Sequence, residues 1–95
     1  MTDSITNVHG TVIEVGQVWA DNDRRSEGRT MRVVAIEMGY IRRAVCELLT
    51  DVGGLEPSRP RTVRIKVDRM HPTSTGYLLV SDPGAFSRVR AEMKP

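Results

Sequence analysis

Apolar residues recur at every second position over much of this chain, and polar segments interrupt them at short intervals. In residues 62–67, three β-branched apolar residues alternate with one threonine and two basic residues, which is the pattern of a strand with one buried face. Residues 29–38 and 41–50 form two longer segments of strand character, separated only by Gly39-Tyr40. Two strands joined by so tight a turn predict a β-hairpin.

Three shorter apolar segments also predict strands, and turn-forming residues separate them. The short strands are expected at residues 11–13, 17–20 and 77–80. Turns or loops are expected at residues 14–16, 21–28, 51–60 and 73–76, each of which contains at least one Gly. Along residues 29–38, Met31, Val33 and Ala35 are expected to share one face. Residues 68–72 end the strand before them and are expected to form a single helical turn.

The order of these elements predicts a mainly β protein with one domain. Ninety-five residues are enough for one modest core. Five of these segments, taken as one short strand, the two hairpin strands, the strand at 62–67 and the last short strand, close most economically into a small barrel over residues 11–80, and closure removes exposed strand edges. Residues 1–10 are expected to be a flexible leader. Residues 81–95 are expected to be a tail or a short helix over 84–93, with Asp82 as its cap and Pro83 at its first position.

The barrel prediction agrees with a resemblance carried by two parts of the chain. Residues 15–34 place a Gly and a small apolar strand before a polar loop, then a Gly and a second strand, and so resemble barrels of the KOW and Tudor kind. Together with residues 72–77, they are more closely similar to a group of small uncharacterised proteins from actinobacteria and their phages. The resemblance covers residues 15–80. It implies a Src-homology-three-like barrel and a bacterial or phage origin, and it implies no chemistry.

The composition limits what such a domain contains. Only 4% of the residues are aromatic, so the core must consist mainly of Val, Ile, Leu and Met. Cys46 is the single cysteine, which allows neither an intramolecular disulfide nor a cysteine-based zinc site, and its apolar neighbours favour a buried structural thiol. His9 and His71 show no metal-binding spacing, and no cofactor is expected.

The chain shows no membrane or export signal. No segment reaches the roughly twenty apolar residues that a bilayer requires, and residues 1–7 lack the basic and apolar regions of a secretory signal. A lone cysteine fits a reducing compartment. We therefore expect a cytoplasmic protein of a bacterium or of a phage-infected host cell, with no membrane partner.

The net charge of +2 hides an uneven distribution. Residues 1–23 contain four acidic residues and no Lys or Arg, whereas residues 24–69 contain ten Arg and one Lys against six acidic residues. An excess of Arg over Lys is typical of phosphate recognition by guanidinium groups. It is equally expected from a GC-rich genome, and the sequence does not separate the two explanations.

Basic and aromatic residues of the central region are the candidate binding residues. They are Arg24, Arg25, Arg32, Tyr40, Arg42, Arg43, Arg64 and Lys66. Basic groups neutralise phosphates, and an exposed tyrosine offers a stacking surface. The alternative is an ordinary solvated surface, because acidic residues are interleaved with the basic ones. These are Glu27, Glu37, Glu47 and Asp68.

Four further residues are assigned structural roles. Trp19 either fills one end of the barrel or forms a stacking platform, and core packing is the favoured role. Asp21 and Asp23 lie two positions apart, but the further oxygen ligands of a calcium loop are absent. The two carboxylates are instead expected to cap backbone NH groups and to pair with Arg25 or Arg29.

These features predict a non-enzymatic binding module. No phosphate-binding glycine loop, nucleophile motif or acid–base pair is present, so neither catalysis nor a small-molecule substrate is expected. The favoured ligand is nucleic acid, bound at a basic face. The alternative is a protein–protein module, in which an exposed groove around Trp19, Tyr40 and Tyr77 binds a host or partner protein. Self-association into homo-oligomers through Thr62–Val67 is a further alternative.

Overall fold

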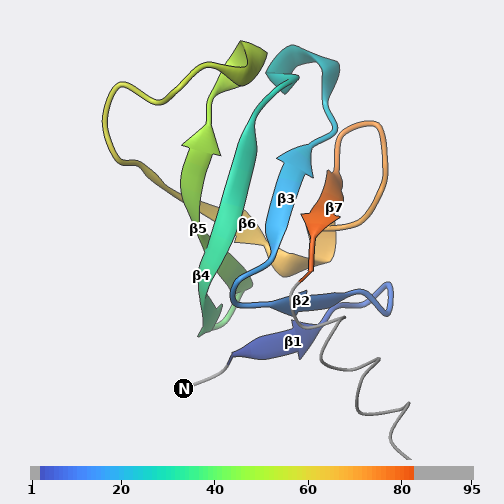
Figure 1. The fold of residues 1–95 in the computed structure, drawn as a ribbon. Helices are drawn as coiled ribbons and strands as arrows, with labels where there is room; N and C mark the ends of the chain where they lie inside the picture. The colour runs from blue at the N-terminus through green and yellow to red at the C-terminus, as the bar shows by residue number, and fades with distance from the viewer. Residues whose placement is uncertain (1–2, 83–95) are drawn as a thin grey trace, which may run out of the picture.

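The computed structural model describes residues 3–82, which form a mainly β structure of seven strands in two antiparallel sheets (Figure 1). The strands are β1 (Ser4–Thr6), β2 (Val12–Glu14), β3 (Val18–Asp21), β4 (Thr30–Met38), β5 (Arg42–Thr50), β6 (Thr62–Lys66) and β7 (Tyr77–Ser81). Short 3-10 turns connect some of them: η1 (Arg24–Ser26), η2 (Val52–Gly54) and η3 (Val67–Arg69). No helix in this part of the chain is long and apolar enough to cross a membrane. The helix expected over residues 84–93 lies outside the described residues.

The larger sheet contains five strands in the order β6-β5-β4-β3-β7. Its two longest strands, β4 and β5, pair from end to end and are joined by the turn Gly39–Ile41, which confirms the predicted hairpin. β3 lies inside the sheet, because it pairs with β4 on one side and with β7 on the other. β6 and β7 are the two edges, and no pairing joins them within residues 3–82. The sheet is therefore open there, and its closure into a barrel stays a prediction.

β1 and β2 form a separate two-stranded sheet at one end of the larger sheet (Figure 1). Ile5 pairs with Ile13 in the register, and Ile13 is fully buried while Ile5 packs against the core. The expectation of a flexible leader over residues 1–10 is therefore wrong for Ser4–Thr6, because Ile5 gains buried apolar contacts that hold these residues in a strand.

Asn7 ties this small sheet to the segment that follows β6. Its Nδ2 donates to the carbonyl oxygens of Val67 (2.9 Å) and Met70 (3.2 Å). Its Oδ1 accepts from the backbone NH groups of His9 (2.9 Å) and Thr11 (3.0 Å). These four bonds satisfy a polar side chain that is only 5% exposed.

The side-chain alternation along β4 changes phase at a β-bulge between Val33 and Ala35. Met31 and Val33 are buried before the bulge, and Ile36 is buried after it, whereas Ala35 is exposed. The expectation that Ala35 shares a face with Met31 and Val33 is therefore wrong. The physical reason is that a bulge adds one residue to one strand and so shifts every later side chain to the opposite face.

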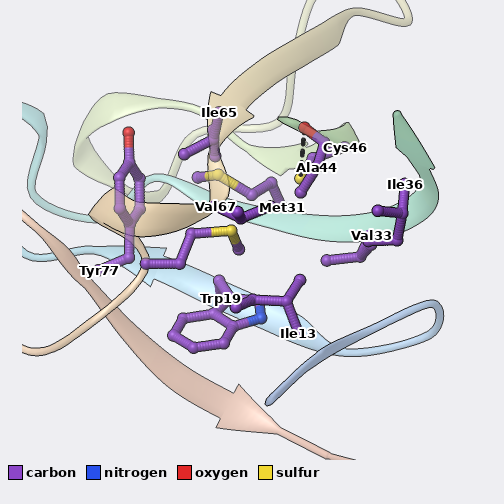
Figure 2. Close-up of a cluster of buried hydrophobic side chains, with 11 residues drawn as sticks. Ile13, Trp19, Met31, Val33, Ile36, Ala44, Cys46, Ile65, Val67 and Tyr77 are labelled. Atoms are coloured by element: carbon purple, nitrogen blue, oxygen red, sulfur yellow. Dashed lines mark hydrogen bonds between the residues drawn. The ribbon is translucent and has the colours of Figure 1, made fainter. Parts of the chain in front are cut away.

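The core lies between the inner face of the larger sheet and the elements that cover its end, β2 and η3 (Figure 2). The sheet contributes Trp19, Met31, Val33, Ile36, Ala44, Cys46, Ile65 and Tyr77, and the covering segments contribute Ile13, Val67 and Met70. Aliphatic and sulfur-containing side chains dominate this cluster, as the low aromatic content predicts. On the opposite face of β4, β5 and β6, the side chains are exposed or half-buried among residues 3–82.

Candidate functional site

Four of the eight candidate binding residues lie together on one face of the larger sheet. They are Arg32 on β4, Arg43 on β5, and Arg64 and Lys66 on β6. Each is next in sequence to a buried residue, namely Val33, Ala44 or Ile65, so the alternation of a strand turns its side chain away from the core. We call this surface, the side of β4, β5 and β6 opposite the core, the outer face.

The strand register fixes which basic residues are neighbours on the outer face. Arg43 lies directly opposite Lys66, and Arg64 lies two positions away along β6, opposite Val45. Directly opposite residues in an antiparallel pair have Cβ atoms roughly 4.5–5.5 Å apart, and like charges at this spacing repel. Within residues 3–82 neither Arg43 nor Lys66 has an ion-pair partner. Their repulsion therefore favours a bound anion.

Two acidic residues share the outer face. Glu37 accepts a hydrogen bond from Nε of Arg64 at 3.1 Å, and both side chains remain about half exposed. In the register of β4 and β5, Glu47 lies directly opposite Arg32, and Glu37 lies directly opposite Arg43. The four basic residues outnumber the two acidic ones, so the outer face keeps a positive charge that is partly neutralised.

The turn Gly39–Ile41, which we call the hairpin tip, lies at one end of the sheet beside this basic surface (Figure 1). Tyr40 at its centre is fully exposed. Two hollows flank the hairpin tip, and its three residues line both of them. The first hollow, of about 330 Å³, is completed by Glu37 and Arg43, and the second, of about 410 Å³, by Arg42, Lys66, Asp68 and Arg69.

Arg42 and Arg69 reach the second hollow from β5 and from η3. Nη2 of Arg42 lies 3.5 Å from a carboxylate oxygen of Asp68. Arg69 donates a hydrogen bond to the carbonyl oxygen of Thr75 at 3.2 Å, and its guanidinium carbon lies 6.0 Å from the ring centre of Tyr77. Arg69 is not among the residues that the sequence points to, because it falls in a predicted turn. The one feature of the sequence that points to Arg69 is that it closely follows the strand that contains Arg64 and Lys66.

Arg24 and Arg25 do not join the outer face. They lie in η1, which contacts η2 at the opposite end of β4 (Figure 1). The nine residues of β4 separate the two ends by roughly 30 Å. Arg25 donates two side-chain hydrogen bonds to Asp23, at 2.7 and 3.1 Å, which lower the pKa of that carboxyl from 3.8 to about 2. The charge of Arg25 is therefore already engaged within its own turn.

Asp21 ends β3, and Asp23 and Arg29 lie in the connection from β3 to β4. Asp23 accepts a hydrogen bond from the backbone NH of Arg25 at 3.0 Å and so caps η1. Asp21 accepts from the backbone NH of Asp23 at 3.0 Å and lies 3.7 Å from Arg29. These contacts explain both carboxylates as parts of the turn.

Trp19 lies in the core and offers no stacking surface to a ligand, since it is only 1% exposed. Its indole Nε1 donates to Oε1 of Gln17 at 3.0 Å. Gln17 is fully buried as well; its Oε1 also accepts from the backbone NH of Glu14, and its Nε2 donates to the carbonyl oxygen of Val12. The polar end of the tryptophan is thus satisfied inside the protein.

Few side chains of the described residues have nucleophilic or metal-binding chemistry. Cys46 is buried, and burial raises the pKa of its thiol to about 12, so the nucleophilic thiolate is scarce at neutral pH. The rings of His9 and His71 are stacked with their centres 3.7 Å apart. Among residues 3–82, no group of three or more His, Cys, Asp and Glu side chains is arranged to hold a metal ion.

The three aromatic residues considered for a protein-binding groove do not share a surface. Trp19 and Tyr77 are buried, whereas Tyr40 is fully exposed. Exposed apolar side chains occur instead on the edge strand β7, where Leu78–Val80 are each at least 42% exposed.

The site is best described by the chemistry of its own residues. No family model, curated protein or solved structure matches the chain. The described residues offer two adjacent unpaired cations, Arg43 and Lys66, further basic groups around them, and the exposed ring of Tyr40. This arrangement is suited to holding an anionic ligand that also carries flat rings.

Proposed function

We propose that this protein is a non-enzymatic module that binds nucleic acid through the outer face. The observation that carries the proposal is the pair Arg43 and Lys66, two basic side chains directly opposite each other. Within residues 3–82 neither forms an ion pair, and Glu37, which lies opposite Arg43 on β4, is bound by Arg64. A phosphate between them removes their repulsion and releases counterions from the polymer, which is the main source of affinity in sequence-independent binding. Arg32 and Arg64 extend the positive charge along the same surface.

The dimensions of the outer face suit an extended polyanion better than a single small anion. Its basic residues are spread over three strands, and neighbouring strands are roughly 4.8 Å apart. Arg64 and Lys66 are separated by roughly 7 Å along β6. One phosphate does not reach all four basic groups, whereas a nucleic-acid strand carries a charge about every 3.4 Å along its axis. Because phosphate contacts carry no sequence information, we expect little sequence preference.

The number of phosphate contacts sets the salt dependence of binding. Four contacts to duplex DNA give a slope of log K against log salt of about −3.6, or a ~150-fold loss of affinity between about 50 and 200 mM salt. If Glu37 and Glu47 each keep one basic side chain in an ion pair, only two basic residues contact phosphates. The slope is then about −1.8, and the affinity falls ~12-fold over the same salt range. We expect the measured slope to lie between these values.

Fluorescence anisotropy with labelled DNA and RNA at several salt concentrations measures this slope. We expect the double variant R43Q/K66Q to reduce the slope by about 1.8, because two phosphate contacts are lost. The matched control is R24Q/R59Q, which removes the same charge from exposed residues outside the outer face and should leave the slope unchanged. The proposal is overturned if neither polymer binds at low salt, or if both double variants weaken binding equally.

We also propose that the fold is a Src-homology-three-like barrel from an actinobacterium or one of its phages, and that the protein works in the cytoplasm. Two features support this fold: β3 pairs with both β4 and β7, and the single turn η3 connects the last two strands. The single buried Cys46 supports a reducing compartment. An experimental structure of the full chain tests whether the sheet closes.

Protein binding is the second candidate function, and Leu78–Val80 on the edge strand β7 favour it. An edge strand with exposed apolar side chains is able to accept a strand from another protein. Leu78→Lys should then abolish capture of a host protein from nuclease-treated lysate, whereas Arg43→Gln should leave capture unchanged. Sedimentation at two concentrations tests self-association through an edge strand such as β6, and a monomer at both concentrations excludes it.

A further inference from the structure

We propose that the hairpin tip makes this site selective for single-stranded nucleic acid. One unpaired base stacks on Tyr40, and the phosphates on either side of that base are held by Arg43 in the first hollow and by Arg42 and Lys66 in the second. This inference rests on the proposed nucleic-acid function and names the form of the polymer that the site takes.

Tyr40 contributes nothing to the core of the protein. Its side chain is fully exposed, and within residues 3–82 it makes no hydrogen bond and no ring or cation contact. The turn itself does not require an aromatic residue, since small polar residues suit such positions better. A tyrosine ring held out in solvent is the feature on which an unpaired base stacks, and such stacking increases affinity by about 5- to 150-fold per base.

The two hollows place positive charge on both sides of this ring. Gly39–Ile41 line both hollows, so a nucleotide stacked on Tyr40 has its backbone entering one hollow on each side. Arg43 lines the first hollow and Lys66 the second, and these two residues are also direct neighbours across β5 and β6. The hairpin tip and the outer face are therefore one continuous binding surface.

The acidic residues at the hollows are held by other partners. Oδ1 of Asp68 accepts a hydrogen bond from the backbone NH of Val8 at 3.0 Å, which keeps the carboxylate in place. Its ion pair with Arg42 is longer, at 3.5 Å, and both side chains are 35% exposed or more, so a phosphate competes for Arg42 at low cost. In the first hollow, Glu37 is bound by Arg64 at 3.1 Å.

A duplex does not use Tyr40 in the same way. The bases of a duplex are stacked on one another, so their faces are closed to a side chain unless a base is flipped out at the expense of stacking and pairing. A single strand presents the faces of its bases without that cost. The outer face binds the phosphates of either form, but only the single strand gains the additional stacking contact.

The test compares single-stranded and duplex DNA of equal length at low salt, using the full chain and fluorescence anisotropy. Tyr40→Ala should weaken single-strand binding by about 5- to 150-fold and should change duplex binding by less than about twofold. Tyr40→Phe keeps the ring and should retain the preference. Leu55→Ala is the control, because Leu55 is an exposed apolar residue that lies outside the hairpin tip and the outer face.

The outcomes separate this inference from the proposed function. If both polymers bind with the expected salt dependence and Tyr40→Ala changes neither, or weakens both equally, the inference is overturned and the proposed function stands. If neither polymer binds at low salt, both fail. A second readout is the fluorescence of the exposed indole in the variant Tyr40→Trp. Single-stranded DNA should quench this fluorescence, and duplex DNA should leave it unchanged.

Discussion

Replacement of Asn7 by alanine removes the side chain that ties β1 and β2 to the segment after β6. Four hydrogen bonds are lost, two to carbonyl oxygens of Val67 and Met70 and two from the backbone NH groups of His9 and Thr11. An internal hydrogen bond contributes ~1 kcal/mol net, and a buried group left without a partner costs more. The buried carbonyl group of Met70 loses its partner, whereas that of Val67 still accepts from the backbone NH of Met70 at 3.1 Å, and the two NH groups lie in a partly exposed turn. We expect the free energy of unfolding to fall by about 2–4 kcal/mol.

This loss is a large fraction of the stability of such a domain. A chain of 95 residues is expected to have a free energy of unfolding of about 5–14 kcal/mol. The substitution should therefore lower Tm by roughly 8–30 °C. Urea unfolding followed by tryptophan fluorescence measures the change directly, because Trp19 is the single tryptophan and lies in the core. The m-value should stay the same.

Asn22→Ala is the matched control, since it makes the same chemical change at the other asparagine. Nδ2 of Asn22 donates one exposed hydrogen bond, to the carbonyl oxygen of Thr73 at 2.6 Å, so its loss should cost less than about 1 kcal/mol. If Asn7→Ala costs no more than this control, Asn7 does not hold the small sheet in place and the reasoning is refuted.

Three further predictions concern single residues. Cys46, whose thiol pKa is about 12, should resist thiol reagents at pH 8 in the native protein and react on unfolding; rapid native labelling would contradict its burial. Gly28→Ala should destabilise the fold by at least ~2 kcal/mol in urea unfolding, because φ is +92° and a Cβ would collide with the backbone nitrogen of Gly54. The Asp23 carboxylate should titrate near pH 2 by NMR, and its contribution to stability should be complete above pH 3.8 and lost as the pH falls through 2. Arg25→Ala should return that pKa towards 3.8, and an unchanged value would exclude Arg25 as the cause.

The strands were predictable where hydrophobic residues repeat with a period of two and turns are marked by Gly. β4, β5 and β6 meet both conditions, and every one of their bounds lies within one residue of the expected one. The bulge in β4 was not predictable, because Val34, Ala35 and Ile36 are all apolar and a change of phase leaves no mark in such a run. Asn7 was not predictable either, since its partners are backbone carbonyl groups that any residue supplies.

The candidate site was predictable in its residue types and only partly in its arrangement. Arg43 and Lys66 were expected at the site, but their direct opposition depends on the register between β5 and β6, which the long loop between these strands does not reveal. Arg24 and Arg25 have the same chemistry and yet lie at the other end of β4. The sequence gives the charge of each residue directly. The end of the sheet at which a residue lies depends on the lengths of the strands and turns before it.

The pairing of β3 with β7 has a consequence for the order of events during folding. β3 is among the first strands to be synthesised, but it pairs with the last described strand, and Asn7 bonds to a residue sixty positions further along the chain. Contacts between such distant segments form slowly, because a long loop must close before they add stability. The pairs β1–β2, β3–β4 and β4–β5 have both strands translated early, whereas the pairing of β3 with β7 and the bonds of Asn7 to Val67 and Met70 wait for residues 67–81. During that interval one side of β3 is an unpaired edge that neighbouring chains can reach, and the pairing with Tyr77–Ser81 is what closes it.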